Sequence, residues 1–423
     1  MTQRLKLGCI ADDFTGATDL ANTLVRGGMR ALQTIGVPAA APLAQADAIV
    51  VALKSRTVPA DDAIEQSLHA LRWLREQGAQ QIYFKICSTF DSTPQGNIGP
   101  VAEALMDALD SDFAIVTPAF PDNARTVFMG HLFVGDLLLS ESGMRDHPLT
   151  PMRDANLIRV LQAQCRHTVG LIDQRSVAHG VVAIGERIAA LRTQGIALAI
   201  ADAVSNDDLM RLGAAAKGMR LVVGGSGLAI GLPQNWDLIA ADAATHLPAV
   251  DGAEAIVCGS CSQATQRQVR RFIDDGGAAL AIDPVRIGAG EDAVTSALAW
   301  AQLQLPHGPV LVYSSASADT VAAIQAALGI ARAGALVEQA LAAIARGLVE
   351  RGVRRLVVAG GETSGACVQA LGVEQMQIGA QIDTGVPWCH TTCEAAPDGL
   401  QLALKSGNFG GDEFFARAFA TPA

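Results

Sequence analysis

The sequence predicts an α/β protein of two domains, each with a mainly parallel sheet flanked by helices. Short apolar runs recur along the chain, and each is followed by a turn and then by a stretch with helical spacing. The runs are nearly continuous rather than alternating, which is typical of strands that are buried on both faces of a parallel sheet. The chain of 423 residues is also long enough for two or three domains with sizeable cores.

The expected elements follow one another in two series. The first strand is expected at residues 5–10, and the helix after it has an apolar stripe that ends at Gly27 and Gly28. Further strands are expected at residues 49–53, 81–85, 113–117, 221–223, 256–258, 280–283, 310–313 and 356–359. A stretch rich in proline, alanine and aspartate separates the two series. It predicts a linker at residues 236–252 between domains at 1–235 and 253–423.

Composition and charge exclude several classes of protein. Half of the residues are hydrophobic and 17% are charged, which argues against intrinsic disorder. The formal charge is -11 and the basic residues are scattered, so we expect no nucleic-acid partner. The sequence has no continuous apolar run long enough for a membrane span and begins without an apolar signal segment. We therefore expect a cytoplasmic protein that does not contact a membrane.

The cysteines suggest reduced thiols rather than a disulfide framework. Eight of them are spread along a chain with no export signal. Cys258 and Cys261 form a C-x-x-C pair, and Cys389 and Cys393 lie far downstream, so a zinc site would need two distant segments to converge. We favour buried thiols that act as small hydrophobic side chains over such a site.

Charged residues follow the first predicted strands, at the carboxyl ends where α/β sheets bind their ligands. Asp12 and Asp13 come directly after the first strand, and either could act as a general base or orient a hydroxyl group. Capping of the next helix is the structural alternative, although Thr15 is the expected cap. Arg56 follows the strand at residues 49–53 and suits a carboxylate, because its planar guanidinium can donate two parallel hydrogen bonds. An ordinary surface arginine is the alternative there.

A long polar loop follows the strand that ends at Lys85. The loop contains Ser88, Thr89 and Asp91 among turn-forming residues. Hydroxyl groups at this density can hydrogen-bond a polyhydroxylated ligand from several directions, although a plain polar connection would have the same composition. We interpret the segment as a binding loop.

Two histidines and a glycine turn give less specific signals. A lone histidine, such as His131 or His147, more often makes a structural hydrogen bond than contacts a substrate. The turn at residues 224–227 (Gly-Gly-Ser-Gly) permits close approach of the backbone and could direct N–H groups at an anion, but glycine turns are common.

Glycine-rich turns also follow strands of the second domain. Residues 360–363 (Gly-Gly-Glu-Thr) stand between a predicted strand and a predicted helix, which suits a phosphate at the helix N-terminus. Glu362 could hold a water bound to Mg²⁺. Residues 259–262 and 405–412 could complete a nucleotide pocket. The chain has neither a G-x-x-x-x-G-K-[ST] loop nor a dinucleotide-binding G-x-G-x-x-G motif, which disfavours an NAD-dependent oxidoreductase.

The two halves therefore offer different chemistry. The first has acids, cations and hydroxyl groups for a small polar acid, and the second has turns that suit a phosphate-rich ligand. We expect an active site in the interdomain cleft, where closure of the domains would bring the two ligands together.

The ordered set of motifs resembles the four-carbon acid sugar kinase family over essentially the whole chain. The motifs are Ala-Asp-Asp-Phe-Thr-Gly-Ala at residues 11–17, Lys-Ser-Arg at 54–56, Ser-Thr-Phe-Asp-Ser-Thr at 88–93, Gly-Gly-Ser-Gly at 224–227, Gly-Gly-Glu-Thr-Ser-Gly at 360–365 and Lys-Ser-Gly-Asn-Phe-Gly-Gly at 405–411. The resemblance implies an N-terminal sugar-acid domain, a C-terminal nucleotide domain and ATP-dependent phosphorylation of a terminal hydroxyl group.

The resemblance also implies a role for each position that matches a motif. The residues expected to contact the sugar acid are Asp12, Arg56, Lys85, Ser88, Thr89, Asp91, Arg125, His131 and Ser226. The residues expected to contact ATP are Ser260, Gly360, Gly361, Glu362, Thr363 and Gly407. Asp12 or Asp13 would be the catalytic base, and Arg56 or Lys85 would neutralise the substrate carboxylate. Mg²⁺ is the second expected cofactor, with its protein ligands left open, and a homo-oligomer is one possible assembly.

Residues 87–93, 118–125 and 130–133 are most similar to the branch of the family whose acceptor is a 3-oxo-tetronate, phosphorylated at the C4 hydroxyl. Kinases of D-threonate or D-erythronate are the alternative within the family. A sugar-acid sensor without catalytic activity is the alternative from another class, since two-domain α/β proteins also serve as binding proteins.

Overall fold

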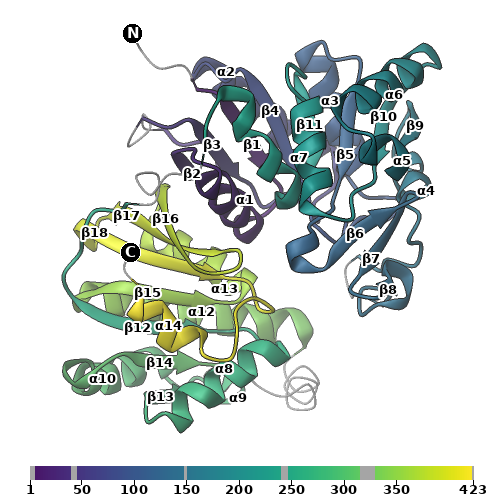
Figure 1. The fold of residues 1–423 in the computed structure, drawn as a ribbon. Helices are drawn as coiled ribbons and strands as arrows, with labels where there is room; N and C mark the ends of the chain where they lie inside the picture. The colour runs from purple at the N-terminus through teal and green to yellow at the C-terminus, as the bar shows by residue number, and fades with distance from the viewer. Residues whose placement is uncertain (1–4, 40–44, 147–149, 240–245, 315–328, 422–423) are drawn as a thin grey trace. The chain divides into compact units, whose positions relative to one another are not determined.

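The computed structural model describes residues 5–39, 45–146, 150–239, 246–314 and 329–421. The chain divides into two compact units, residues 1–245 and 246–423 (Figure 1). Each unit has strands with helices packed against them, so the predicted α/β class is confirmed. No helix within the described ranges is long and apolar enough to cross a membrane.

The main strands of the first unit are parallel throughout. They lie in the order β2-β3-β1-β4-β11-β5-β10-β9. Their bounds are β1 (Leu7–Ala11), β2 (Ala31–Ile35), β3 (Ala48–Ala52), β4 (Gln81–Lys85), β5 (Ala114–Thr117), β9 (Thr168–Ile172), β10 (Ile196–Ala201) and β11 (Leu221–Gly224). Ala11 pairs with Ala52 and Lys85, so β1, β3 and β4 end level with one another. The residues that follow them meet at one edge of the sheet.

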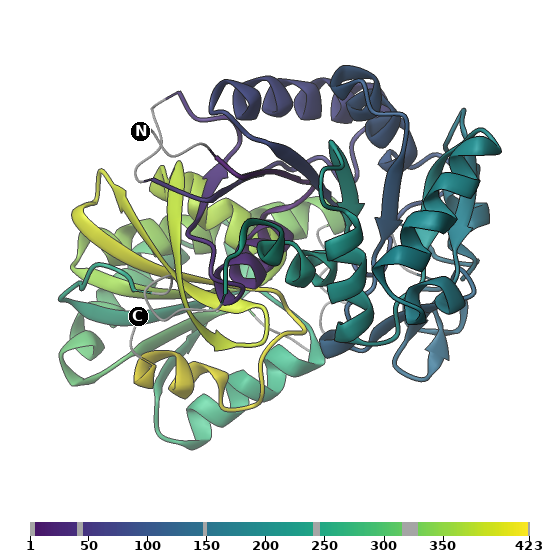
Figure 2. The ribbon, with the colours of Figure 1, turned by 45° about the horizontal axis from the view of Figure 1, so that its top comes forward.

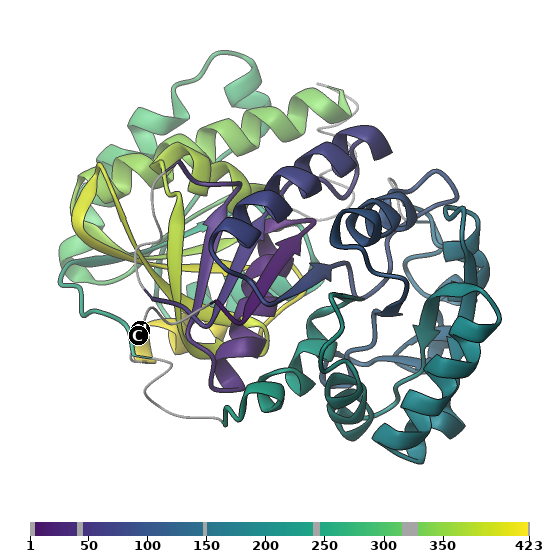
Figure 3. The same cartoon turned by 90° about the horizontal axis from the view of Figure 1, so that it is seen from above.

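Helices cover both faces of this sheet (Figure 3). Their bounds are α1 (Phe14–Arg26), α2 (Ala60–Glu76), α3 (Ile98–Leu109), α4 (Leu157–Gln162), α5 (Gln174–Ala178), α6 (Val181–Thr193) and α7 (Asn206–Ala215). Helices α2 and α3 pack together on one face, while α1 and α7 lie on the other face and both contact the 3₁₀ turn at Ser226–Gly231. This turn directly follows β11 and is buried along most of its length.

A small antiparallel sheet is inserted after β5. It consists of β6 (Arg125–Phe128), β7 (His131–Val134) and β8 (Leu137–Leu138). Asp202, fully buried after β10, accepts hydrogen bonds from the backbone N–H groups of Met129 and Gly130 at 2.8 Å each. It also accepts one from the N–H of Gln174 at 2.9 Å. A buried carboxylate with three donors ties the hairpin to the main sheet.

The second unit combines a parallel sheet with antiparallel strands. The order of the strands is β13-β14-β12-β15-β18-β17-β16. β17 is antiparallel to both of its neighbours, β16 and β18. The bounds are β12 (Ala253–Cys258), β13 (Ala278–Ala281), β14 (Val310–Tyr313), β15 (Val353–Ala359), β16 (Gln375–Asp383), β17 (Val386–Cys393) and β18 (Ala396–Lys405). Cys258 pairs with Ala359, and Ala359 pairs with Lys405. The parallel strands β12, β15 and β18 therefore also end level.

Helices lie on both faces of this second sheet (Figure 2). Their bounds are α8 (Gln263–Asp274), α9 (Pro284–Gly288), α10 (Ala293–Gln304), α12 (Ile330–Glu350), α13 (Gly361–Leu371) and α14 (Phe414–Ala420). Helix α14 contacts α8 on one face, and α12 lies beside α13 on the other. Residues of the predicted linker also pack on this unit, since Leu247 would collide with a side chain at Gly379 and the Pro248 carbonyl accepts from Gln401.

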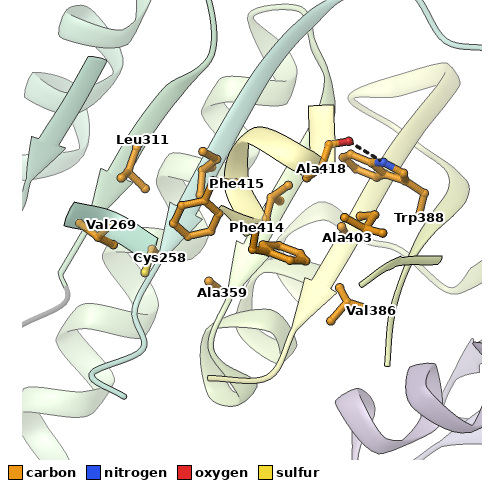
Figure 4. Close-up of a cluster of buried hydrophobic side chains, with 13 residues drawn as sticks. Cys258, Val269, Leu311, Ala359, Val386, Trp388, Ala403, Phe414, Phe415 and Ala418 are labelled. Atoms are coloured by element: carbon orange, nitrogen blue, oxygen red, sulfur yellow. Dashed lines mark hydrogen bonds between the residues drawn. The ribbon is translucent and has the colours of Figure 1, made fainter. Parts of the chain in front are cut away.

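The core of the second unit lies between its sheet and helix α14 (Figure 4). Phe414 and Phe415 of α14 and Trp388 of β17 are buried there among aliphatic side chains. The Trp388 indole N–H donates to the carbonyl of Ala418 at 3.0 Å, which satisfies its one polar atom. This packing fixes the last helix close to the end of β18.

Candidate active site

The charged residues that follow β1, β3 and β4 lie together at the ends of these strands. The Asp12 N–H donates to the Lys85 carbonyl at 3.2 Å. The Asp12 carbonyl accepts from the N–H groups of Ser55 and Arg56 at 3.0 and 3.1 Å. Three loops that are distant in sequence are thus joined by backbone hydrogen bonds, and their side chains share one site.

Arg56 is the centre of this cluster. Its guanidinium forms a bidentate pair with Asp12, from Nε to Oδ2 at 2.9 Å and from Nη2 to Oδ1 at 2.8 Å. Nη2 also contacts Asp13 Oδ1 at 2.7 Å, and Nη1 lies 4.0 Å from Asp91 Oδ2. Because Arg56 is already engaged by carboxylates of this chain, its donors are largely occupied before any ligand arrives.

The two adjacent aspartates are in different electrostatic situations. Burial raises the pKa of Asp12 above its ordinary value, although the Arg56 charge opposes the shift. Burial acts in the same direction on Asp13, but the charges of Arg56 and Lys85 and the hydrogen bonds from Thr15 and Gly16 outweigh it and lower the pKa of Asp13. Asp12 is therefore the better proton acceptor of the two near neutral pH.

Asp13 also caps helix α1. Its Oδ1 accepts from the Gly16 N–H at 3.1 Å, and its Oδ2 accepts from the Thr15 hydroxyl at 2.9 Å. Thr15, which we expected to be the cap, instead lies in the first turn of the helix. Asp13 is the cap because it directly precedes the helix, where its carboxylate reaches the N–H groups that the first turn leaves without partners.

The loop after β4 is held by its own side chains and by the neighbouring loop. Thr89 donates to Asp91 Oδ1 at 2.6 Å, and Phe90 and Asp91 adopt positive φ angles of 66° and 42°. The Asn97 amide donates to the carbonyls of Ser55 at 2.8 Å and Val58 at 3.1 Å. This connection positions the loop against the segment that carries Arg56. Ser88 lies half-buried in the same turn.

Lys85, which the sequence predicted as a site residue, and Asp19, which it did not, form a buried part of the cluster. Lys85 donates to the Ile86 carbonyl at 2.7 Å. Asp19 projects from α1 and is only 7% exposed, and its Oδ1 has no hydrogen-bond partner within the described part of the chain. Burial raises the pKa of Asp19 to about 6, and the Lys85 charge and the Ser226 hydroxyl oppose that shift only in part. The sequence contains no signal for its burial, because Asp19 lies opposite the apolar stripe of α1, a helix that is buried on nearly all sides.

We expect Asp19→Asn to stabilise the protein at neutral pH. A carboxyl group whose pKa is raised in the folded state favours the fold below the unfolded pKa, and this contribution is lost as pH rises through about 6. The shift from 3.8 to about 6 corresponds to roughly 3 kcal/mol at most. The measurement is the free energy of unfolding of both proteins in urea at pH 4.5 and 7.5. A difference between the two that does not grow with pH would contradict the assignment.

Arg125 of β6 lies close to Cys87 and Asp91 of the site. The hydrogen-bond partners of His131 on β7 are instead Met129 and Asn156, which are not part of the charged cluster. The Arg125 guanidinium donates to the Asn123 carbonyl, but its buried Nε has no hydrogen-bond partner in the described ranges. Burial lowers the pKa of Arg125, and the nearby Cys87 and Asp91 oppose this. His131 has Nδ1 2.9 Å from the Met129 carbonyl and Nε2 3.3 Å from the amide of Asn156.

Arg125 therefore has more hydrogen-bond donors available for a ligand than Arg56 has. Both ring nitrogens of His131 are used within the protein. The other histidine singled out by the sequence, His147, lies outside the described residues.

In the second unit, the predicted glycine turns lie side by side. The N–H groups of Gly259 and Ser260 donate to the Ala359 carbonyl at 3.0 and 3.3 Å, and the Gly360 N–H donates to the Lys405 carbonyl at 2.8 Å. A Cβ atom on Gly407 would lie 2.5 Å from Ser260 Oγ. These turns approach so closely that a side chain at Gly407 would force a shift.

Helix α13 begins within this group of turns. Gly360 stands at its cap position with a φ of 124° and offers no side-chain cap, so its first turn directs backbone N–H groups outward. Gly361 and Glu362 are exposed in that turn and Thr363 is buried. A helix N-terminus of this kind suits a phosphate group.

The described ranges hold no cluster of three or more His, Cys, Asp or Glu side chains that could bind a metal ion. Of the cysteines considered for zinc, Cys258 and Cys389 are buried, and burial raises the pKa of each to about 12. Cys261 is exposed. Buried thiols of this kind act as small hydrophobic side chains of the core.

Known proteins share both units of this chain. A model of a sugar-binding N-terminal domain matches residues 7–232, and a model of a nucleotide-binding C-terminal domain matches residues 255–415. The 3-oxo-tetronate kinase of Cupriavidus necator is 59% identical over 99% of this chain and 97% of its own length. That of Pseudomonas fluorescens is 59% identical over 97% of this chain and 96% of its own length.

Solved structures agree with these similarities. A Salmonella typhimurium protein is 44% identical with a TM-score of 0.89, and 98% of each chain is covered. A Haemophilus influenzae protein is 42% identical with a TM-score of 0.82, covering 98% of this chain and 99% of its own. The two matched domains, together with strand ends rich in charge in one unit and in glycine in the other, indicate a nucleotide-dependent enzyme. The chain belongs to the four-carbon acid sugar kinase family, whose members are phosphotransferases with an alcohol group as acceptor.

Proposed function

We propose that the chain is an ATP-dependent kinase that transfers the γ-phosphoryl group to the C4 hydroxyl of a 3-oxo-tetronate. The observation that carries this proposal is the full-length identity of 59% to relatives that are 3-oxo-tetronate kinases. The charged cluster of the first unit supplies a proton acceptor and cations for the sugar acid. The glycine turns of the second unit supply backbone N–H groups for a triphosphate. Kinases of threonate or erythronate remain the alternative within the family.

On the acceptor side, Asp12 accepts the proton of the C4 hydroxyl. Its raised pKa favours this role, and its bidentate pair with Arg56 fixes the direction of the carboxylate. Asp13 holds the other side of Arg56 and caps α1. Arg125 takes the substrate carboxylate in place of Arg56, because Nε and Nη2 of Arg56 are paired with Asp12 and Asp13 while Nε of Arg125 has no hydrogen-bond partner in the described ranges. Lys85, which donates to the Ile86 carbonyl, is the second candidate cation.

The remaining residues of the acceptor site line and orient it. Thr89 and Asp91 present oxygen atoms beside Arg56 and Arg125, and Ser88 lies in the same turn. Ser226 is buried close to Asp19, and its hydroxyl has no hydrogen-bond partner within the described ranges, so we place it beside that carboxylate rather than in contact with the substrate. His131 orients the hairpin, since both of its ring nitrogens are engaged.

On the donor side, ATP binds where β12, β15 and β18 end. The backbone of residues 360–363 and the turns that carry Ser260 and Gly407 surround the phosphates. Mg²⁺ would be held mainly by the phosphate oxygens, with Glu362 as the carboxylate closest to the start of α13, and would neutralise charge on the transferred group. This fits a set of side chains that contains no dedicated metal cluster in the described ranges.

Asp12 and ATP account for every bond and proton that changes in the phosphoryl transfer. The acceptor oxygen attacks the γ-phosphorus as its proton passes to Asp12, and the bond from that phosphorus to the bridging oxygen breaks to release ADP. The assignment of residues 1–235 to the sugar acid and 253–423 to the nucleotide, and the closure of the two domains on their ligands, are part of this proposal.

A substrate panel tests the proposal. Purified protein is assayed for ADP release with ATP and Mg²⁺ on 3-oxo-tetronate, D-threonate and D-erythronate. We expect the highest kcat/KM on the 3-oxo acid, and a higher value on threonate or erythronate would favour the alternative. Binding of an acid without ADP release would instead indicate a sensor. No turnover on any four-carbon acid would refute the kinase assignment.

A further inference from the structure

We propose that Lys405 is a positioning residue for ATP, whose buried ammonium group holds the turn at residues 406–409 in its nucleotide-binding shape. The inference rests on the proposed function, because it assumes that this turn contacts ATP. It goes further by assigning a role to the first residue of the motif at residues 405–411, for which the sequence indicated no function. It also predicts that ATP affinity depends on the charge of that one side chain.

The geometry around Lys405 is unusual for a lysine. The residue is the last of β18 and is 0% exposed. Its Nζ lies 3.0 Å from Thr265 Oγ1 and at 3.0, 3.1 and 3.2 Å from the carbonyls of Ser406, Gly407 and Phe409. Buried lysines normally pair with a carboxylate. Among the described residues, the hydrogen-bond partners of this one are neutral oxygen atoms.

Those partners explain what the ammonium does. Three carbonyl groups of one turn converge on a single charge, and the Gly407 carbonyl also accepts from the hydroxyls of Ser262 and Thr265. Without the charge, these carbonyl dipoles would repel one another and the turn would open toward water. The turn must keep its shape because Gly407 packs directly on Ser260.

The protonation state of Lys405 is sensitive to pH and to a bound anion. Burial lowers the pKa of Lys405 to about 8, and Cys258 on β12 opposes the shift. Of the other elements packed on it, α8 presents Thr265 and α14 presents the Phe414 ring at 5.9 Å, and neither of these titrates. Bound triphosphate is strongly anionic, so it would favour the ammonium form. By linkage, ATP binding above pH 8 should then be accompanied by proton uptake.

The test compares Lys405→Met with the wild-type protein at pH 7. We expect the Kd for ATP, measured by calorimetry without acceptor, to rise by about tenfold or more, which corresponds to the loss of one charge-assisted contact network. We expect kcat at saturating ATP to fall by less than about threefold and the KM for the acid to stay unchanged. Lys217→Met, which removes an exposed lysine of the first unit, is the matched control. An unchanged Kd in a folded Lys405→Met protein would overturn the proposal.

The wild-type protein supplies a second test that does not depend on the folding of a variant. We expect its Kd for ATP to rise between pH 7 and 9.5, with proton uptake detected by calorimetry in buffers of different ionisation enthalpy. A Kd that is constant over this range, with no proton uptake, would overturn the proposal. Failure of the wild-type protein to bind ATP at any pH would refute the proposed function itself, which separates the two outcomes.

Discussion

Asp12→Asn is expected to lower kcat by about 10² to 10⁴-fold, because the acceptor hydroxyl then loses the group that takes its proton. Asparagine has the same shape and keeps one oxygen that can accept from Arg56, so the loops that meet at the ends of β1, β3 and β4 should stay joined by their backbone hydrogen bonds. The KM for ATP should not change. The measurement is steady-state ADP release on the best acid of the panel, with circular dichroism to verify folding.

Asp13→Asn is the matched control for this effect. Asparagine caps a helix as well as aspartate does, so the start of α1 should be preserved. The variant weakens the contact with Arg56 but leaves the Asp12 pair intact, and we expect a loss in kcat of less than about tenfold. A larger loss in Asp13→Asn than in Asp12→Asn would move the proton acceptor to Asp13. Near-normal turnover in both would remove the aspartates from the base role.

The pH profile of the wild-type protein gives an independent readout of the same group. Because the pKa of Asp12 is raised, kcat should fall as pH is lowered through a value above that of an ordinary aspartate, when the base becomes protonated. This acidic limb should be lost in Asp12→Asn, whose residual rate has no carboxylate to titrate at that position. An unchanged acidic limb in the variant would assign the limb to another group.

The strands that carry the site could be predicted because they are buried on both faces. Each predicted strand, such as those ending near Asp12, Lys85 and Gly360, is confirmed with shifts of a few residues. Among the strands that were missed, β10 (Ile196–Ala201) is itself a continuous apolar run, so its pattern does not explain the omission. The antiparallel strands of the second unit differ in pattern. β16, β17 and β18 carry polar residues such as Gln377 and Thr391 among apolar ones, as antiparallel strands do, and so gave no continuous run.

Side-chain partnerships could not be predicted, because they depend on which loops meet. The sequence placed Arg56 at a strand end, but its pairing with Asp12 and Asp13 follows from the register of β1 with β3. Lys405 was visible only as part of a glycine-rich loop, and its burial follows from Thr265 and Phe414 on two helices. The motifs therefore predicted where the site lies, but the role of each charged side chain could be assigned only from the tertiary structure.

Arg125→Gln is expected to raise the KM for the sugar acid by about 10 to 100-fold, with a smaller effect on kcat. A charge-assisted hydrogen bond to a carboxylate contributes about 1.5–3 kcal/mol, and glutamine keeps polarity without the charge or the planar fork. The Nε of Arg125 has no hydrogen-bond partner in the described ranges, so the variant breaks few contacts within the protein. The measurement is KM on the 3-oxo acid and on the corresponding uncharged four-carbon sugar.

Comparison of the two acceptors separates recognition of the carboxylate from a general defect. The wild-type protein should prefer the acid strongly, and Arg125→Gln should lose most of that preference by weakening the acid alone. Arg56→Gln is the contrasting variant: it leaves Asp12 and Asp13 without their shared cation, so it should lower kcat on both acceptors. If Arg56→Gln abolished the preference and Arg125→Gln left it intact, the carboxylate would have to bind at Arg56, with the Asp12 pair broken in the substrate complex.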